Sequence, residues 1–90
     1  MTEYKENEIE DELSKYEGWS YDGDRIRKNY EFDTYMDGIE FVNDLAEMAE
    51  AANHHPDLHV GFREVEVTLK SHDVDAITDR DFDLVKEIEE

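Results

Sequence analysis

Two hydrophobic periods meet at Pro56, the only proline of the chain, and each belongs to a different backbone conformation. Before Pro56, apolar residues recur every three or four positions, which is the spacing of one face of a helix. This stripe consists of Ile39, Val42, Leu45, Ala46 and Ala49. Proline cannot continue a helix and restricts the residue before it, so we predict that the helix ends near Ala52.

After Pro56 the apolar residues alternate, which is the period of a strand. They occupy even positions from Leu58 to Phe62 and odd positions from Val65 to Leu69. Because alternate residues of a strand share one face, this change of parity predicts a turn near residues 62–64 between two strands.

The first third of the chain predicts a helix followed by a hairpin. Apolar residues four and three positions apart within residues 7–16 indicate a short amphipathic helix, in which Asn7 and Glu10 resemble a capping box. The next stretch, WSYDGDRIRKNYEF, alternates on both sides of Asp22-Gly23 and therefore predicts two antiparallel strands.

Capping signals mark the starts of the two remaining helices. Asp33 or Thr34 can cap the long helix, and Thr78, with Asp81 three residues later, can cap the last one. The element order is therefore α-β-β-α-β-β-α. Because the strands come in pairs, we predict an α+β fold, with a four-stranded antiparallel sheet and the helices packed on one face, in a single domain spanning residues 1–90.

Alternate residues of each strand then face away from the helices. That second face of the sheet must be polar or covered by a partner subunit. The aromatic residues of the hairpin, Trp19, Tyr21 and Tyr30, favour some such coverage.

The chain is strongly acidic, with 27 acidic residues against nine basic ones and a formal charge of -18. This charge argues against binding to nucleic acid or to an anionic membrane surface. No apolar run is long enough to span a membrane, and the first residues lack a secretion signal, so we expect a cytoplasmic protein. The charge has three explanations: a surface adapted to high salt, which the five lysines favour, an acidic interaction surface, or a mimic of nucleic acid.

Three of the four histidines lie within ANHHPDLH, residues 52–59. His54 and His55 follow the long helix, and His72 follows the last strand, so two segments could bring imidazoles into one cleft. Histidine suits proton transfer near neutrality because its unperturbed pKa is about 6.5. The absence of cysteine excludes thiolate nucleophiles and thiolate metal sites.

Two carboxylates are candidate supporting groups. Glu50 lies one helical turn before His54 and is placed to orient a ring. Asp81, in the first turn of the last helix, could face the same region or could simply be an acid at a helix N-terminus.

The residues alone leave other interpretations open. The His-His-Pro step can be a helix-terminating turn in which imidazoles satisfy the last carbonyls. His55, His59 and His72 could also form a metal site with carboxylates, although Pro56 breaks the helical geometry that would place the first two on one face. The serines lack the glycine-framed elbow of a nucleophile.

Three blocks, FVNDLAEMAEAANHHPDLHV, VEVTLKSH and AITDRDFDL, resemble the pterin-4a-carbinolamine dehydratase family. The family pattern is a helix ending in Asn/Asp-His-His-Pro, a strand ending in Thr/Ser-His, and a Leu-Thr-x-x-Asp helix start. EGW and YEF also fall where the family has strands, so the resemblance covers nearly the whole chain.

The resemblance implies a dehydratase that removes water from 4a-hydroxytetrahydropterin to give the quinonoid dihydropterin, without a metal or redox cofactor. It makes His54, His55 and His72 the active-site histidines, with His54 and His72 as the proton donors and His55 as the binding residue. The implied pterin-binding residues are Asn53, His54, His55, Lys70, Ser71, His72 and Asp73, and the supporting acids are Glu50 and Asp81. The resemblance also implies a homo-dimer or homo-tetramer.

Two departures from the family pattern bear on this expectation. Leu58 stands where the family usually has Trp, which removes a stacking surface, and Ala76-Ile77-Thr78 replaces a Gly-Leu-Thr step.

Two other function classes stay open. One is a non-catalytic pterin-binding or protein-interaction module, because animal members of the family also serve as dimerisation partners of a transcription factor. The other is a histidine-carboxylate metal-binding protein.

Overall fold

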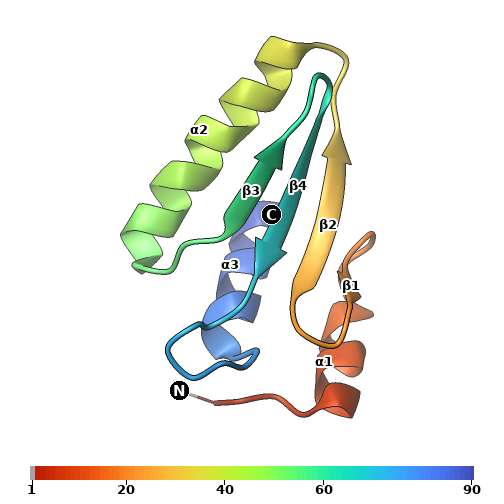
Figure 1. The fold of residues 1–90 in the computed structure, drawn as a ribbon, viewed down its shortest axis with the longest axis vertical. Coiled ribbons are helices and arrows are strands. Elements are labelled where there is room, and N and C mark those ends of the chain that lie inside the picture. Colours follow the sequence, from red (N-terminus) through yellow and green to blue (C-terminus); the bar gives the residue numbers. More distant parts are fainter. Residues whose placement is uncertain (1) are drawn as a thin grey trace.

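The computed structural model of the protein describes residues 2–90 and has the predicted order of elements (Figure 1). They are α1 (Glu6–Leu13), β1 (Ser20–Tyr21), β2 (Ile26–Glu31), α2 (Tyr35–Ala52), β3 (Asp57–Val60), β4 (Glu64–Leu69) and α3 (Asp79–Glu89). The α+β class and the α-β-β-α-β-β-α order are confirmed.

The four strands form one antiparallel sheet in the order β1-β2-β4-β3. In the centre of the sheet, Val67 of β4 lies opposite Lys28 of β2 and Leu58 of β3. The turn between β3 and β4 falls at residues 61–63, next to the predicted position, so the change of parity does mark two strands.

The core lies between the helices and one face of the sheet. Val65, Val67 and Leu69 alternate along β4 and are fully buried, as the pattern predicts. Helix α2 contacts β3, β4 and α3, and α1 contacts β1. The buried helical residues that complete this core are Ile9, Leu13, Leu45, Phe82, Leu84 and Val85.

The outer face of the sheet is polar. Glu66 of β4 accepts a hydrogen bond of 3.4 Å from Arg27 of β2. The aromatic coverage expected from the hairpin is not found there, because Trp19 is buried in the core and Tyr30 packs against Trp19 and Phe41 on the helix side. The reason is the register: Tyr30 lies opposite the buried Val65 and shares its face.

Helix α2 has the predicted cap and the predicted end. The Thr34 hydroxyl accepts a hydrogen bond from the Asp37 amide at 3.1 Å. At the other end Asn53 adopts left-handed angles, φ 51° and ψ 40°, and the His54 amide donates to the Ala49 carbonyl at 3.1 Å. This termination turns the chain sharply before Pro56.

The inward stripe of α2 differs in part from the predicted one. It consists of Gly38, Phe41, Val42, Leu45, Met48 and Ala49. Ile39 is only partly buried and lies outside the core cluster, and Ala46 is exposed. Val42, Leu45 and Ala49 are common to both stripes, so the helix is rotated slightly from the orientation that Ile39 suggested.

Helix α1 starts one residue before the predicted range and uses another cap. The Lys5 amide donates to the Glu8 carboxylate at 2.8 Å, whereas Asn7 and Glu10 were the predicted pair. The preceding residues run beside residues 77–79, where the Tyr4 amide donates to the Ile77 carbonyl at 2.9 Å. This long-range pairing fixes where the helix can begin.

Among residues 2–90, no helix has the length and apolar character needed to cross a membrane.

Candidate active site

The antiparallel register brings the predicted site residues to one end of the sheet. Asp57, the first residue of β3, lies opposite Thr68 near the end of β4. The segment before Asp57 carries His54 and His55, and the segment after Leu69 carries His72. Figure 1 shows that the C-terminal end of α2, the start of β3 and the loop after β4 all lie at this end. The α3 N-terminus follows that loop.

His54 points into the protein and meets Asp81. The Nε2 atom of His54 lies 2.6 Å from Oδ1 of Asp81, and the two side chains are 8% and 0% exposed. Asp81 also accepts a hydrogen bond from the Thr78 amide at 2.9 Å, as the third residue of a capping box. The two interpretations of Asp81, a helix-terminus acid and a partner of the histidine site, therefore hold together.

Ser71 belongs to the same buried group. Its hydroxyl donates to Oδ2 of Asp81 at 3.0 Å and lies 2.7 Å from the Thr78 hydroxyl. The side chain is fully buried, so its polar group faces Asp81 and not solvent. The structure thus joins the Ser71 side chain to the pair of His54 and Asp81.

His55 lies on the opposite side of the turn and is exposed. Its Nε2 atom is hydrogen-bonded to the carboxylate of Glu50, which is exposed as well. The predicted carboxylate is therefore present, but it orients the ring of His55 and not that of His54. His54 and His55 have different neighbours because the backbone of Asn53 adopts left-handed angles and the chain becomes extended at Pro56.

His72 is also exposed, and its nearest acid is one that sequence reasoning missed. The Nε2 atom of His72 lies 3.9 Å from Oδ2 of Asp57, which in turn pairs with Arg25. The hydrogen bond that the Arg25 guanidinium donates to Asp57 raises the pKa of Arg25. The only signal in the sequence was the position of Asp57 directly after the His-His-Pro step.

The remaining predicted residues are engaged in ion pairs. Lys70 is held by Asp24 and by Asp75, with 2.5 Å to the latter, and the hydrogen bonds that its amine donates to these carboxylates raise its pKa. Asp73 accepts a hydrogen bond of 2.6 Å from Arg80, which lowers the pKa of the Asp73 carboxyl. These contacts tie the loop after β4 to the β1–β2 turn and to α3.

A mostly apolar pocket of about 360 Å³ opens beside His55. Its lining residues are Leu45, Ala46, Ala49, Glu50, His55, Pro56 and Leu58. Leu58, the departure from the family pattern, forms part of this wall. A flat ring could lie against the apolar wall with its polar edge toward His55 and Glu50.

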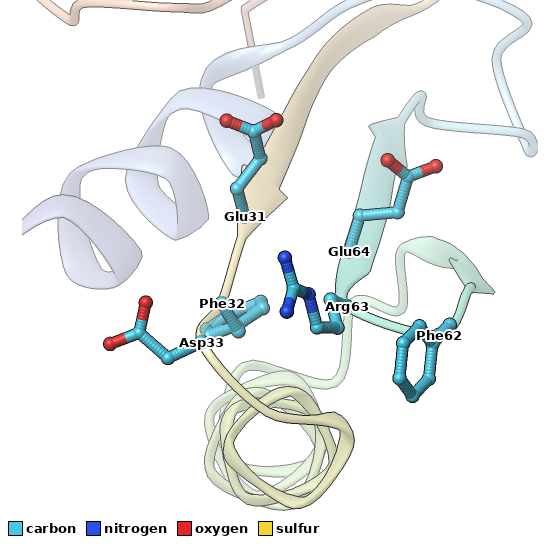
Figure 2. Close-up of a pocket in the computed structure, with 6 residues that line it drawn as sticks. All are labelled: Glu31, Phe32, Asp33, Phe62, Arg63 and Glu64. Carbon is cyan, nitrogen blue, oxygen red and sulfur yellow. The ribbon is translucent and has the colours of Figure 1, made fainter.

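A larger pocket, of about 620 Å³, lies at the opposite end of the sheet. Figure 2 shows the Arg63 guanidinium between the ends of β2 and β4, with the Asp33 carboxylate and the Phe62 ring pointing away from it. The lining residues are Glu31, Phe32, Asp33, Phe62, Arg63 and Glu64. This pocket contains no histidine and none of the predicted site residues, so its size does not make it the candidate active site.

A metal site requires several histidine or acidic side chains arranged around one point. Within residues 2–90, no group of three or more such side chains is arranged to hold a metal ion. The alternative site of His55, His59 and His72 is therefore not formed. His59 lies on β3 opposite Glu66, on the outer face of the sheet.

This small α+β domain, with a His-His-Pro turn and a third histidine at the same end of its sheet, has the architecture of a pterin dehydratase-like protein. The chain belongs to the pterin 4 alpha carbinolamine dehydratase family, whose sequence model matches residues 2–90.

Two curated relatives carry names that assign them provisionally as pterin-4-alpha-carbinolamine dehydratases. The one from Picosynechococcus is 40% identical over 83 residues, which cover 92% of this chain and 90% of the relative. The one from Natronomonas pharaonis is 43% identical over 72 residues, which cover 80% of this chain and 78% of the relative.

Solved structures show the same fold. A transcriptional coactivator/pterin dehydratase from Brucella melitensis superposes with a TM-score of 0.90 at 26% identity, covering 97% of this chain and 95% of that one. A pterin dehydratase-like protein, identified as a RuBisCO assembly factor in the alpha-carboxysome, superposes with a TM-score of 0.69 at 19% identity. That alignment covers 82% of this chain and 88% of the other, and at such low identity it shows the fold alone.

Proposed function

We propose that this protein dehydrates a 4a-hydroxytetrahydropterin to the quinonoid dihydropterin. The observation that carries the proposal is that three histidines from two chain segments lie at one end of the sheet, each beside a carboxylate: Asp81, Glu50 and Asp57. The apolar pocket beside His55 adds a surface of the kind that a flat heterocycle needs.

The reaction requires one proton to be delivered and one to be removed. The bond between C4a and the hydroxyl oxygen breaks, and a general acid protonates the leaving oxygen so that it departs as water. A ring N–H loses its proton, and its electron pair forms the new C=N bond. No electrons are transferred to a second molecule, so two positioned imidazoles are sufficient for the chemistry.

We assign proton transfer to His54 and His72, and substrate binding to His55. His54 has the arrangement of an imidazole held by a buried carboxylate, in which Asp81 orients the ring. At the surface, the acid beside His72 is Asp57, whose Oδ2 lies 3.9 Å from the His72 Nε2 atom. His55 lines the apolar pocket, where the Glu50 carboxylate fixes its ring.

The remaining predicted binding residues act in this proposal by fixing the backbone around the histidines. Lys70 and Asp73 hold the loop after β4 through their ion pairs, and Asn53 gives the helix end its left-handed turn. All of them set where the histidines lie.

A non-catalytic pterin-binding or interaction module of the same fold is the second candidate. Two observations favour it: Leu58 replaces the usual aromatic residue beside the pocket, and Phe62 is 76% exposed at the far end of the sheet. A homo-dimer or homo-tetramer remains a prediction of the family resemblance, and a cytoplasmic location remains a prediction from the sequence.

Turnover of purified protein separates the two candidates. The assay follows dehydration of chemically prepared 4a-hydroxytetrahydropterin, in molar KCl, against the uncatalysed rate. We expect the unaltered protein to accelerate dehydration above the uncatalysed rate, and we expect His54→Ala and His72→Ala to lose this acceleration. Pterin binding measured by fluorescence, without any acceleration, would instead establish the binding module.

A further inference from the structure

Four polar side chains form a continuous buried hydrogen-bond chain at the start of α3. Ser71, Thr78 and Asp81 are 0% exposed, and His54 is 7% exposed. The Thr78 and Ser71 hydroxyl oxygens are 2.7 Å apart, Ser71 is 3.0 Å from Oδ2 of Asp81, and Oδ1 of Asp81 is 2.6 Å from Nε2 of His54. Only His54 among them takes part in the proposed proton transfer.

The chemistry of the partners fixes the direction of every bond in this chain. Asp81 lies in the first turn of a helix and accepts from the Thr78 amide, and both features stabilise an ionised carboxylate, which can only accept. The Ser71 hydroxyl must therefore donate to Asp81, and the Thr78 hydroxyl must donate to Ser71. The Thr78 oxygen in turn accepts from the Arg80 amide at 3.2 Å.

Each hydroxyl then donates once and accepts once from a protein group, and the chain ends at His54. Oδ2 of Asp81 is occupied by Ser71 and by the Thr78 amide, which leaves Oδ1 for the imidazole. An acceptor at this position requires a proton on Nε2. The neutral Nε2–H tautomer and the imidazolium both satisfy this condition, whereas the neutral Nδ1–H tautomer does not, so Nδ1 is the nitrogen free to gain or lose a proton.

We propose that Ser71 and Thr78 are positioning residues that hold the Asp81 carboxylate in one orientation and thereby fix the Nε2–H tautomer of His54. The consequence for catalysis, which rests on the proposed dehydratase function, is that His54 exchanges its proton with the substrate through Nδ1. The assignment of the Nε2–H tautomer rests on the hydrogen bonds alone and does not depend on that function.

The competing explanation is that the two hydroxyls only stabilise the fold. Thr78 is the N-cap of α3, and the backbone of Ser71 is already held by the Ala76 carbonyl, to which its amide donates at 2.9 Å. A purely structural role predicts lower stability in the variants with an unchanged tautomer. The tautomer of His54 therefore separates the two explanations.

The test uses nitrogen-15 NMR of the histidine side chains in the full-length protein. We expect neutral His54 to be entirely the Nε2–H tautomer in the unaltered protein and a mixture of both tautomers in Ser71→Ala and Thr78→Val. Thr78→Ser keeps the hydroxyl and should restore the single tautomer. Thr34→Val is the matched control, because it removes the N-cap hydroxyl of α2, and it should leave His54 unchanged.

Kinetics provide the second measurement. Loss of a positioned proton-transfer group in Ser71→Ala and Thr78→Val should lower kcat about ten-fold while KM changes less than about two-fold, since the substrate contacts remain. Thr78→Ser and Thr34→Val should stay close to the unaltered rate.

An Nδ1–H tautomer in the unaltered protein overturns the inference, as does a single Nε2–H tautomer that persists in both hydroxyl-deleted variants. If Thr78→Val does not fold, the His54 tautomers of Ser71→Ala and of the unaltered protein still test the inference. A protein with the expected tautomers but no dehydration would disprove the proposed function and leave the positioning role standing.

Discussion

His54 and Asp81 are 27 residues apart in sequence and meet in a buried hydrogen bond, with 2.6 Å between Nε2 and Oδ1. The bond joins the C-terminal end of α2 to the first turn of α3. Through its second oxygen Asp81 also binds Ser71, which follows β4, and the amide of Thr78. One carboxylate thus connects the three segments that form this end of the sheet.

Removal of this carboxylate should destabilise the protein strongly. In Asp81→Ala, the His54 ring, the Ser71 hydroxyl and the Thr78 amide lose their acceptor in a buried site, and loss of one partner of such a group costs about 3–5 kcal/mol. Urea denaturation at constant molar salt measures the change in unfolding free energy. Asp83→Ala, an exposed acid of the same helix, should change it by less than about 0.5 kcal/mol. Equal effects of the two changes would contradict the role of Asp81.

Replacement of the proton-transfer histidines should abolish most turnover. His54→Ala and His72→Ala should each lower kcat by about 10²–10⁴-fold, the usual contribution of a general acid or base. The double variant should cost less than the sum of the two free energies, because both residues act on one transition state. Steady-state dehydration rates measure all three.

His59 is the matched control for that experiment. It lies three residues past the proline, on the outer face of β3, and should tolerate alanine with nearly full activity. A loss of turnover in His59→Ala, with His54→Ala and His72→Ala still active, would reject the assignment of the histidines.

The fold was predictable where local patterns and tertiary packing agree. The parity change after Phe62 predicted the β3–β4 pair, and Thr78 with Asp81 predicted the start of α3. The predictions that were wrong depended on contacts distant in sequence. Helix α1 begins where its preceding segment leaves Ile77, and Ile39 is turned from the core because α2 packs on β3, β4 and α3.

The candidate site could be proposed from the sequence as a set of residues, but its contacts could not be predicted. Spacing and resemblance proposed the three histidines, Glu50 and Asp81, and these residues do lie at one end of the sheet. They could not reveal that Lys70 would be held by Asp24, which is 46 residues away, because that pair exists only when the β1–β2 turn folds beside the end of β4. The inward direction of Ser71 depends in the same way on where α3 begins.

Asp22 should contribute stability that is lost in acid. Hydrogen bonds from the amides of Arg25 and Asp24, together with the Arg27 side chain, lower the pKa of Asp22 from 3.8 to about 2. A group with a depressed pKa in the folded state stabilises the protein above its unfolded value and loses this effect as pH falls toward its folded value. Asp22→Asn should therefore be less stable than the unaltered protein near pH 5, and the difference should shrink as pH falls from about 4 to about 2. Denaturation at several pH values measures it, and a difference that does not vary with pH would contradict the assignment.

Salt should stabilise the protein up to molar concentration, because many of its acids are closer together than a Debye length in dilute buffer. Five of the eight residues of α1 are acidic, and neighbours three or four positions apart on a helix lie about 5–6 Å apart. The Debye length, beyond which salt screens the interaction of two charges, is about 10 Å at 0.1 M salt and about 3 Å at 1 M. Only molar salt therefore screens such pairs.

We therefore expect the melting temperature to fall steadily as KCl is diluted from molar concentration. Glu10→Lys, which replaces an exposed acid of α1 by a base, should raise the melting temperature more in dilute salt than in molar salt, because it removes repulsion that salt otherwise screens. Differential scanning calorimetry of both proteins at several KCl concentrations measures the two slopes. A melting temperature that does not change between dilute and molar KCl would reject the salt-adapted surface and would favour an acidic surface that binds a partner.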